Sequence, residues 1–268
     1  MPAYQKIIWI GLGVTVVAIL ALGYFLFLAP PSSPKTPALP EMSSLAKPPA
    51  TDDPAAVEAA DPDILPLDLD LDQSDGAVRE LVAAAEVPAA MRKWSRQKDL
   101  VRLVVSAVDN IAQGLSPAAQ LPFLAPTDKF STIEKNGVLI LDPRSFRRYD
   151  LMVNVFTAVT DKIWINWYKK LRPTLEKAFK ELGYPGVTFS QRLQQAIELL
   201  LQVPRIDRDL ELDKKVLSFA FTDVNLEDLH PAQKQLLRMG PVNVARIQNK
   251  MRKLAAAINM IRKNNPVD

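Results

Sequence analysis

The chain has 268 residues, with 33 Lys and Arg, 30 Asp and Glu, one His and no Cys. The lack of Cys excludes disulfides, thiolate catalysis and sulfur-based zinc sites. Its formal charge of +3 conceals two blocks of opposite sign. Residues 30–75 contain ten acids and two Lys, whereas the chain from Gly76 onward contains 30 bases and 20 acids. This asymmetry predicts either docking within the chain or a partner on the basic side.

Residues 7–29 carry no charge and no proline. At ~1.5 Å per residue, a helix of this length matches the ~30 Å hydrocarbon core of a bilayer. Trp9 and Tyr24 lie near its ends, where aromatic rings favour the lipid headgroups. The run is too long for an ordinary signal peptide, and residues 27–30 do not resemble a cleavage site. We therefore predict a retained transmembrane signal anchor, with the lipid bilayer as its partner.

Residues 1–6 form a short head that we expect to stay in the cytoplasm. The long C-terminal part would then be exported, which predicts a single-pass protein of the cell inner membrane with a periplasmic domain. Lys6 on one side and Lys35 on the other give almost no charge bias, so orientation rests on the short head.

Residues 30–71 are rich in Pro, Ala and Asp and have no apolar periodicity, which predicts a disordered linker. The acidic run from Asp68 resembles the start of a calcium loop. However, Gln73 and Arg79 occupy the positions of the required Gly and Glu, so no metal is expected. Residues 72–268 are predicted to form a globular domain.

The domain is predicted to be mainly α, with a minor β part of one or two short hairpins. Asn136-Gly137 favours a type I′ turn between strands 130–133 and 138–141, and strands 210–212 and 216–221 form the second pair. Pro173 is expected to kink or split the longest helix. Periodicity and capping residues predict helices over 77–85, 100–114, 142–153, 161–182, 190–204 and on both sides of 239–241.

Four separated motifs occur in order: Val108-Asp109-Asn110, Arg147-Arg148-Tyr149-Asp150, residues 181–186 (Glu-Leu-Gly-Tyr-Pro-Gly) and residues 233–241 (Gln-Lys-Gln-Leu-Leu-Arg-Met-Gly-Pro). This pattern resembles the bacterial envelope family named domain of unknown function 3014, over roughly the C-terminal two thirds. The anchor and Pro-rich linker also fit that family's layout. The resemblance implies a Gram-negative inner-membrane protein and no activity or cofactor.

Asp109 is predicted in the last turn of a helix, where an acid is unfavourable without a specific partner. Arg147 or Arg148 could supply that partner through a bidentate bond. A structural ion pair is favoured over a ligand site. The candidate binding residues are Asp109, Asn110, Arg147, Arg148, Tyr149 and Asp150.

The C-terminal helix carries apolar residues at alternating spacings of three and four: Val244, Ile247, Met251, Leu254, Ile258 and Ile261. Such a seam predicts packing against the domain, or against a protein partner or second copy, and the basic flank of the helix could also meet an anionic surface. The bases around it, expected to stay hydrated, are Arg246, Lys250, Arg252, Lys253, Arg262 and Lys263. No nucleic-acid motif accompanies them, so a nucleic-acid partner is not expected.

The sequence contains no phosphate loop, nucleophile elbow or zinc-protease motif. Its single histidine, His230, precedes Pro231 and is interpreted as a helix junction. We therefore expect no enzyme, no cofactor and no catalytic residue. The favoured function is a periplasmic non-catalytic interaction or scaffold domain. The alternative is an envelope ligand-binding protein or hydrolase with its site near Asp109, Arg147, Arg148 and Asp150.

Overall fold

The computed structural model describes residues 65–216 and 218–263, with side chains up to residue 257 in the last helix. The chain divides into two units, residues 1–53 and 54–268, and every described residue belongs to the second. The predicted head, the anchor at 7–29 and most of the linker lie outside the described residues. Within the described ranges, no helix has both the length and the apolar character that crossing a bilayer requires.

The described domain is mainly α-helical with two small antiparallel strand pairs, as predicted. The strands are β1 (Thr132–Lys135), β2 (Val138–Leu141), β3 (Leu212–Lys214) and β4 (Phe219–Phe221). Short 3-10 turns cover Leu71–Gln73, Pro117–Ala119 and Pro122–Leu124. The helices are α2 (Ser74–Ala83), α3 (Ala89–Trp94), α4 (Leu100–Ala112), α5 (Arg144–Arg147), α6 (Asp150–Ala158), α7 (Asp161–Lys180), α8 (Phe189–Leu201), α9 (Val224–Glu227), α10 (Pro231–Leu237) and α11 (Pro241–Lys263).

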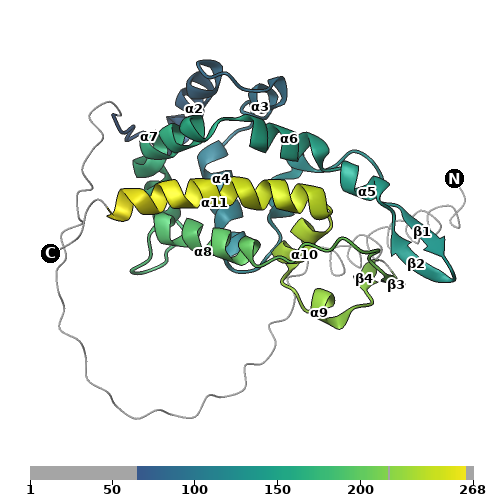
Figure 1. Ribbon diagram of the computed structural model, residues 1–268. Coiled ribbons are helices and arrows are strands. Elements are labelled where there is room, and N and C mark those ends of the chain that lie inside the picture. The colour runs from purple at the N-terminus through teal and green to yellow at the C-terminus, as the bar shows by residue number, and fades with distance from the viewer. Residues whose placement is uncertain (1–64, 217, 264–268) are drawn as a thin grey trace, which may run out of the picture. The chain divides into compact units, whose positions relative to one another are not determined.

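Helix α4 packs against both α7 and α8 (Figure 1). Its buried Val101 and Val105 meet Leu175 and Phe179 of α7 and Phe189 of α8. Helix α11 lies against α6, α7 and α8, with Val244 and Ile247 in the main core cluster. Apolar burial, at about 25 cal/mol per Å², therefore holds together helices that are distant in sequence.

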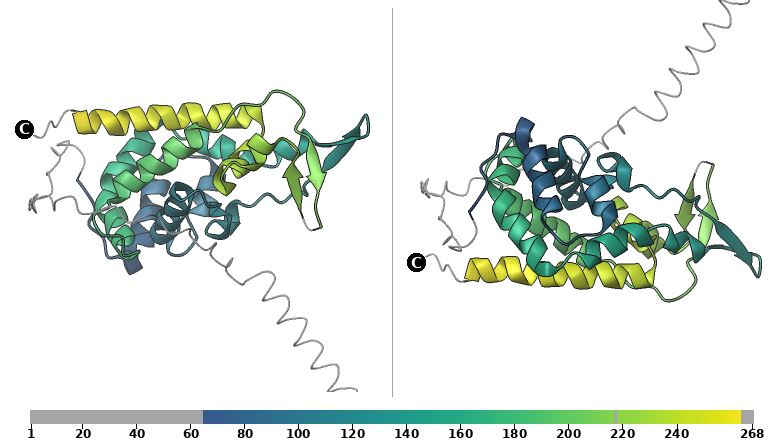
Figure 2. Two further views of the ribbon diagram at one scale, coloured as in Figure 1. Left: turned by 90° about the horizontal axis from the view of Figure 1, so that it is seen from below. Right: turned by 90° about the horizontal axis from the view of Figure 1, so that it is seen from above.

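Both hairpins lie at one end of the helical body, and the C-terminal end of α11 lies at the other (Figure 2). Asn136 (φ 54°) and Gly137 (φ 77°) both adopt positive φ between β1 and β2, as the predicted type I′ turn requires. The Leu141 amide donates to the Leu210 carbonyl at 2.8 Å, which connects the two strand pairs.

Several predicted boundaries were wrong. The helix expected over 142–153 is two helices, α5 and α6. Helix α7 continues through Pro173 without a break. Helix α8 starts before the predicted residue 190 because Thr188 caps it: the Thr188 hydroxyl accepts from the Gln191 amide, and the Gln191 side chain accepts from the Thr188 amide.

The last part of the predicted linker lies along α7. The Leu67 amide donates to the Lys170 carbonyl at 2.7 Å, near the point where Pro173 removes a donor from the helix. The Thr174 hydroxyl donates to the Leu67 carbonyl at 2.7 Å and accepts from the Leu69 amide at 3.3 Å. The acidic segment entering the domain is therefore bonded to α7 through its backbone.

Candidate functional site

Asp109 is buried at the interface of α4 and α8, where it meets Arg192. Arg192 Nε lies 2.9 Å from Asp109 Oδ1. Neither atom has a well-aligned hydrogen-bond partner in the described residues, so their attraction is that of an ion pair. Helix α8 begins after the Thr188 cap, which places Arg192 one turn into the helix and facing α4.

The other carboxylate oxygen of Asp109 accepts two hydrogen bonds. Gln113, the residue directly after α4, donates from Nε2 at 2.7 Å, and the Tyr184 hydroxyl donates at 3.1 Å. Tyr184 belongs to the 181–186 motif, which follows α7. Asp109 therefore joins three elements, and its carboxylate is closed off by residues of the same domain.

A second contact fastens the 181–186 motif to α4. Arg102 donates from Nε and Nη2 to the two oxygens of Glu181, at 2.7 and 3.0 Å. These bonds outweigh desolvation and lower the pKa of the Glu181 carboxyl. Both ends of α4 thus hold the same motif, which fixes the position of the Tyr184 ring.

Arg192 extends the cluster toward the surface. Its guanidinium lies 4.7 Å from the centroid of the Tyr184 ring, and Nη1 donates to Gln195 Oε1 at 3.1 Å. The Tyr184 ring also stacks on Phe179, with 5.7 Å between centroids. Asp109, Gln113, Tyr184, Arg192 and Gln195 are called the Asp109 cluster below.

The predicted pairing of Asp109 with Arg147 or Arg148 is wrong. Arg147 is exposed on α5. Arg148 Nε donates to the Asp128 carbonyl at 2.8 Å, and its guanidinium lies over the ring of Tyr149. The Arg192 side chain supplies the partner instead, because helix packing brings α8 and not α5 against the end of α4.

The remaining residues of the predicted site occupy other surroundings. Asn110 is half-buried on α4, and its carbonyl accepts from the Leu115 amide at 2.8 Å. Asp150 starts α6 and accepts from Asn243 Nδ2 at 2.8 Å. The predicted site is therefore divided: Asp109 joins the 181–186 motif, while Asp150 joins the start of α11.

The contact between Asp150 and the start of α11 is accompanied by a close approach of the backbone at Gly240 to Phe146. Gly240, with φ +83°, precedes α11, and a Cβ built on it would lie 2.5 Å from Cγ of Phe146. Asn243 Nδ2 also donates to the Met239 carbonyl at 3.2 Å. The motifs at 147–150 and 233–241 thus meet, just as those at 108–110 and 181–186 do.

The C-terminal helix packs against its own domain, as one of the predicted alternatives stated. Val244 and Ile247 are buried, Met251 and Leu254 are half-buried, and Arg252 and Lys253 are exposed. The side chains of Ile258 and Ile261 lie outside the described residues.

One residue of this helix contradicts the prediction that its basic residues stay hydrated. Lys250 is 7% exposed. Its Nζ donates to the Val159 carbonyl and pairs with Asp161 Oδ1. Lys250 therefore closes the junction between α6 and α7.

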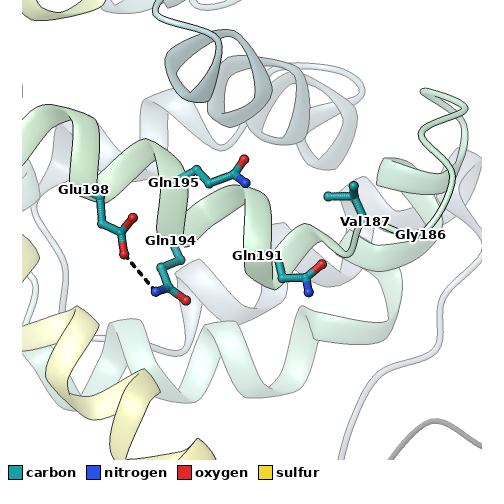
Figure 3. A pocket seen from close by; sticks show the side chains of 6 residues that line it. All are labelled: Gly186, Val187, Gln191, Gln194, Gln195 and Glu198. Atoms are coloured by element: carbon teal, nitrogen blue, oxygen red, sulfur yellow. Dashed lines mark hydrogen bonds between the residues drawn. The ribbon is translucent and has the colours of Figure 1, made fainter. Parts of the chain in front are cut away.

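A surface depression of about 430 Å³ lies on the outer side of α8, next to the Asp109 cluster (Figure 3). Its lining residues are Gly186, Val187, Gln191, Gln194, Gln195 and Glu198. Gln195 belongs to both, so the buried ion pair is connected to the surface through the hydrogen bond from Arg192. This α8 depression is not among the sites predicted from sequence. The polar lining residues Gln191, Gln194, Gln195 and Glu198, spaced along one helix, were the available indication, but exposed helix faces commonly look the same.

Among the described residues, no group of three or more His, Asp or Glu side chains is placed to hold a metal ion. His230 lies at the start of α10, which confirms the predicted junction, and its amide donates to Gln233 Oε1 at 3.1 Å. The imidazole lies against Gly114, where a Cβ would approach Nδ1 to 2.6 Å. This contact explains why glycine follows α4.

The fold and site define a mainly helical domain whose buried polar residues tie neighbouring helices together. Residues 100–255 match the family described as protein of unknown function (DUF3014). The chain belongs to this family, since the match covers more than half of it. Neither a curated protein nor a solved structure matches the chain.

Proposed function

We propose that this chain is a single-pass protein of the bacterial inner membrane whose helical domain serves in the periplasm as a non-catalytic interaction or scaffold module. One observation carries the non-catalytic part of the proposal: Asp109 is enclosed by Arg192, Gln113 and Tyr184 of its own domain. A carboxylate with these partners stabilises the helix packing and has no free face for a substrate. What the domain then offers to other molecules is its surface.

The α8 depression supports the same conclusion. A hydrolase commonly needs two ionisable groups, or a nucleophile and a base, within hydrogen-bond reach of one another. The described lining contains a single carboxylate, Glu198, whose Oε1 accepts from Gln194 Nε2 at 2.8 Å. This chemistry favours recognition over bond cleavage.

The alternative function, a ligand-binding protein or hydrolase centred on Asp109, Arg147, Arg148 and Asp150, requires those side chains to meet around one cavity. Asp109 pairs with Arg192 and Asp150 with Asn243, so the four belong to separate clusters. The alternative is therefore less well supported than the interaction module.

The membrane part of the proposal rests on the apolar residues 7–29 and is tested by reporter fusions. Alkaline phosphatase fused after Asp75 and after Asp268 should be active, because the enzyme matures outside the cytoplasm. The same fusions lacking residues 7–29 are the control and should be inactive. Activity of a cytoplasmic reporter at both positions would overturn the proposed localisation.

The interaction part is tested by site-specific photo-crosslinking of the intact protein in membranes. A photoreactive residue at Gln195 should give a discrete adduct, while the same residue at Asn154, exposed on α6, should not. If Asp109→Asn keeps the parent melting curve but abolishes the cellular phenotype of the gene, a binding site at Asp109 replaces the structural interpretation.

A further inference from the structure

We propose that the α8 depression, together with the neighbouring Tyr184 ring, binds a segment of a neutral glycan strand. This inference rests on the proposed interaction function and names the class of partner. Nothing in the family description assigns a ligand to this surface.

The shape of the depression favours a polymer. Its described lining comes entirely from α8 and the turn before it, and the six residues are labelled in Figure 3. Small-molecule sites usually bury 70–90% or so of their ligand. A ligand on this open surface remains half-exposed, which suits one stretch of a long chain that continues past both ends.

The chemistry of the lining excludes several other ligand classes. An anion requires a free cation, but the Arg192 guanidinium is already engaged by Asp109 and Gln195. No group of three His, Asp or Glu side chains among the described residues is placed to hold a metal ion, and the lining itself has one carboxylate, Glu198. A peptide usually anchors its apolar side chains in pockets, and Val187 is the only large apolar side chain in the described lining. Amides both donate and accept, as hydroxyl and acetamido groups do.

The polar groups are held in place before any ligand arrives. Gln191 Oε1 accepts from the Thr188 amide, Gln195 Oε1 accepts from Arg192, and Glu198 Oε1 accepts from Gln194. Each of Gln191, Gln195 and Glu198 thus has one side-chain atom fixed by the protein. The other atom, an amide NH₂ or a carboxylate oxygen, makes no hydrogen bond to the described residues and is available to a ligand. Such preorganisation reduces the loss of side-chain entropy on binding.

Tyr184 adds an apolar surface beside these groups. It lies two residues before Gly186 of the lining and is 37% exposed. The ring is fixed by Arg192 at 4.7 Å, by Phe179 at 5.7 Å and by its hydroxyl bond to Asp109. The part of the ring that Arg192 and Phe179 leave exposed offers apolar contact to the C–H groups of a pyranose, whose hydroxyls would then bond the adjacent amides.

The test is calorimetric titration of the full-length protein in detergent with two neutral probes, a chitin tetrasaccharide and cellotetraose. We expect saturable binding of at least one probe. The N-acetylated probe should bind more tightly if the natural ligand carries acetamido groups, as peptidoglycan does, and equal binding indicates another neutral polysaccharide.

The variant Gln195→Ala with Glu198→Ala should weaken binding about tenfold or more, since it removes two hydrogen-bonding groups of the lining. The matched control is Gln202→Ala, an exposed glutamine at the end of α8 and outside the lining, which should bind as the parent does. Circular dichroism melting of every variant separates loss of binding from loss of folding.

Absence of saturable binding to both probes would overturn the glycan proposal, as would binding that the double variant leaves unchanged. A protein adduct from Gln195 in the membrane crosslinking, without glycan binding, would reject the glycan while the interaction function stands. Glycan binding by a protein whose fusions report a cytoplasmic domain would instead overturn the localisation alone.

Discussion

Asp109 and Arg192 approach to 2.9 Å in the interface of α4 and α8, yet the Nε–H of the arginine does not point at the carboxylate oxygen. Charge attraction with little solvent screening therefore contributes more to this contact than hydrogen-bond geometry does. Removing one member leaves the other charged, largely buried and only partly compensated.

We expect Arg192→Ala to lower the free energy of unfolding by about 3 kcal/mol, the lower end of the usual cost of breaking a buried pair, since Gln113 and Tyr184 still bind Asp109. Thermal and urea denaturation measure this loss. Arg147→Ala is the matched control, because that arginine is exposed, and it should change stability by less than about 0.5 kcal/mol. Asp109→Leu with Arg192→Met should recover part of the loss. The structural role is wrong if Arg147→Ala is the more harmful of the two single variants.

Gly240→Ala should destabilise the domain more than Gly183→Ala. Both glycines have positive φ, +83° and +79°, so alanine pays a similar backbone cost of about 1–2 kcal/mol at each. A Cβ at Gly183 meets nothing within 4 Å, whereas one at Gly240 lies 2.5 Å from Phe146. The additional loss, on the order of 1–3 kcal/mol for overpacking, is measured by urea denaturation. Adding Phe146→Ala to Gly240→Ala should cost less than the two changes separately, and strict additivity would show that the contact is unimportant.

Lys250→Ala should cost about 1–3 kcal/mol, because the buried Val159 carbonyl loses its donor and Asp161 its counter-ion. Lys253→Ala, on the exposed side of the same helix, should be nearly neutral. Chemical denaturation of the two variants at one salt concentration gives the comparison. Equal effects would mean that Lys250 does not close the junction between α6 and α7.

Acid should weaken the start of α5. Two hydrogen bonds from Arg144, one from its side chain and one from its amide, lower the pKa of the Asp142 carboxyl to about 2. The unfolded value is about 3.9, so the unfolded chain binds more protons in this range. The contribution of Asp142 to stability is complete above about pH 5 and declines as pH falls from about 4 to about 2. Urea midpoints between pH 6 and pH 2 should fall less steeply for Asp142→Asn than for the parent. Parallel curves for the two proteins would contradict this assignment.

The local sequence was sufficient to predict those elements that the backbone preferences of one or two residues determine. The Asn136-Gly137 turn and the helix break at Gly240-Pro241 need only the backbone preferences of those residues. Helix α3 escaped prediction because six residues are too few to display a period. Pro173 failed to split α7 because one missing donor costs less than the burial of the Leu175 and Phe179 side chains that follow it.

Features that depend on tertiary packing could not be predicted in the same way. Asp109 was correctly expected to need a partner, but the choice of Arg192 among many arginines depends on which helix packs against α4. Lys250 resembles its exposed neighbours in sequence, and only the packing of α11 against the end of α6 gives it a buried acceptor, the Val159 carbonyl. The predicted site therefore contained one member of the Asp109 cluster and lacked the other four, which are Gln113, Tyr184, Arg192 and Gln195.

The hydrogen bonds that the backbone of residues 67–69 makes with α7 determine how the domain would respond to mechanical force. The segment advances along α7 in the direction of the helix, from Lys170 beside Leu67 to Lys177 beside Leu69. Tension pulling the chain backwards from Leu65 would act nearly along the helix axis. It would load the bonds at Lys170, Thr174 and Lys177 together, in shear, instead of opening them one after another. Because resistance to pulling is governed by the unfolding rate, this geometry makes the entry to the domain a point of mechanical strength.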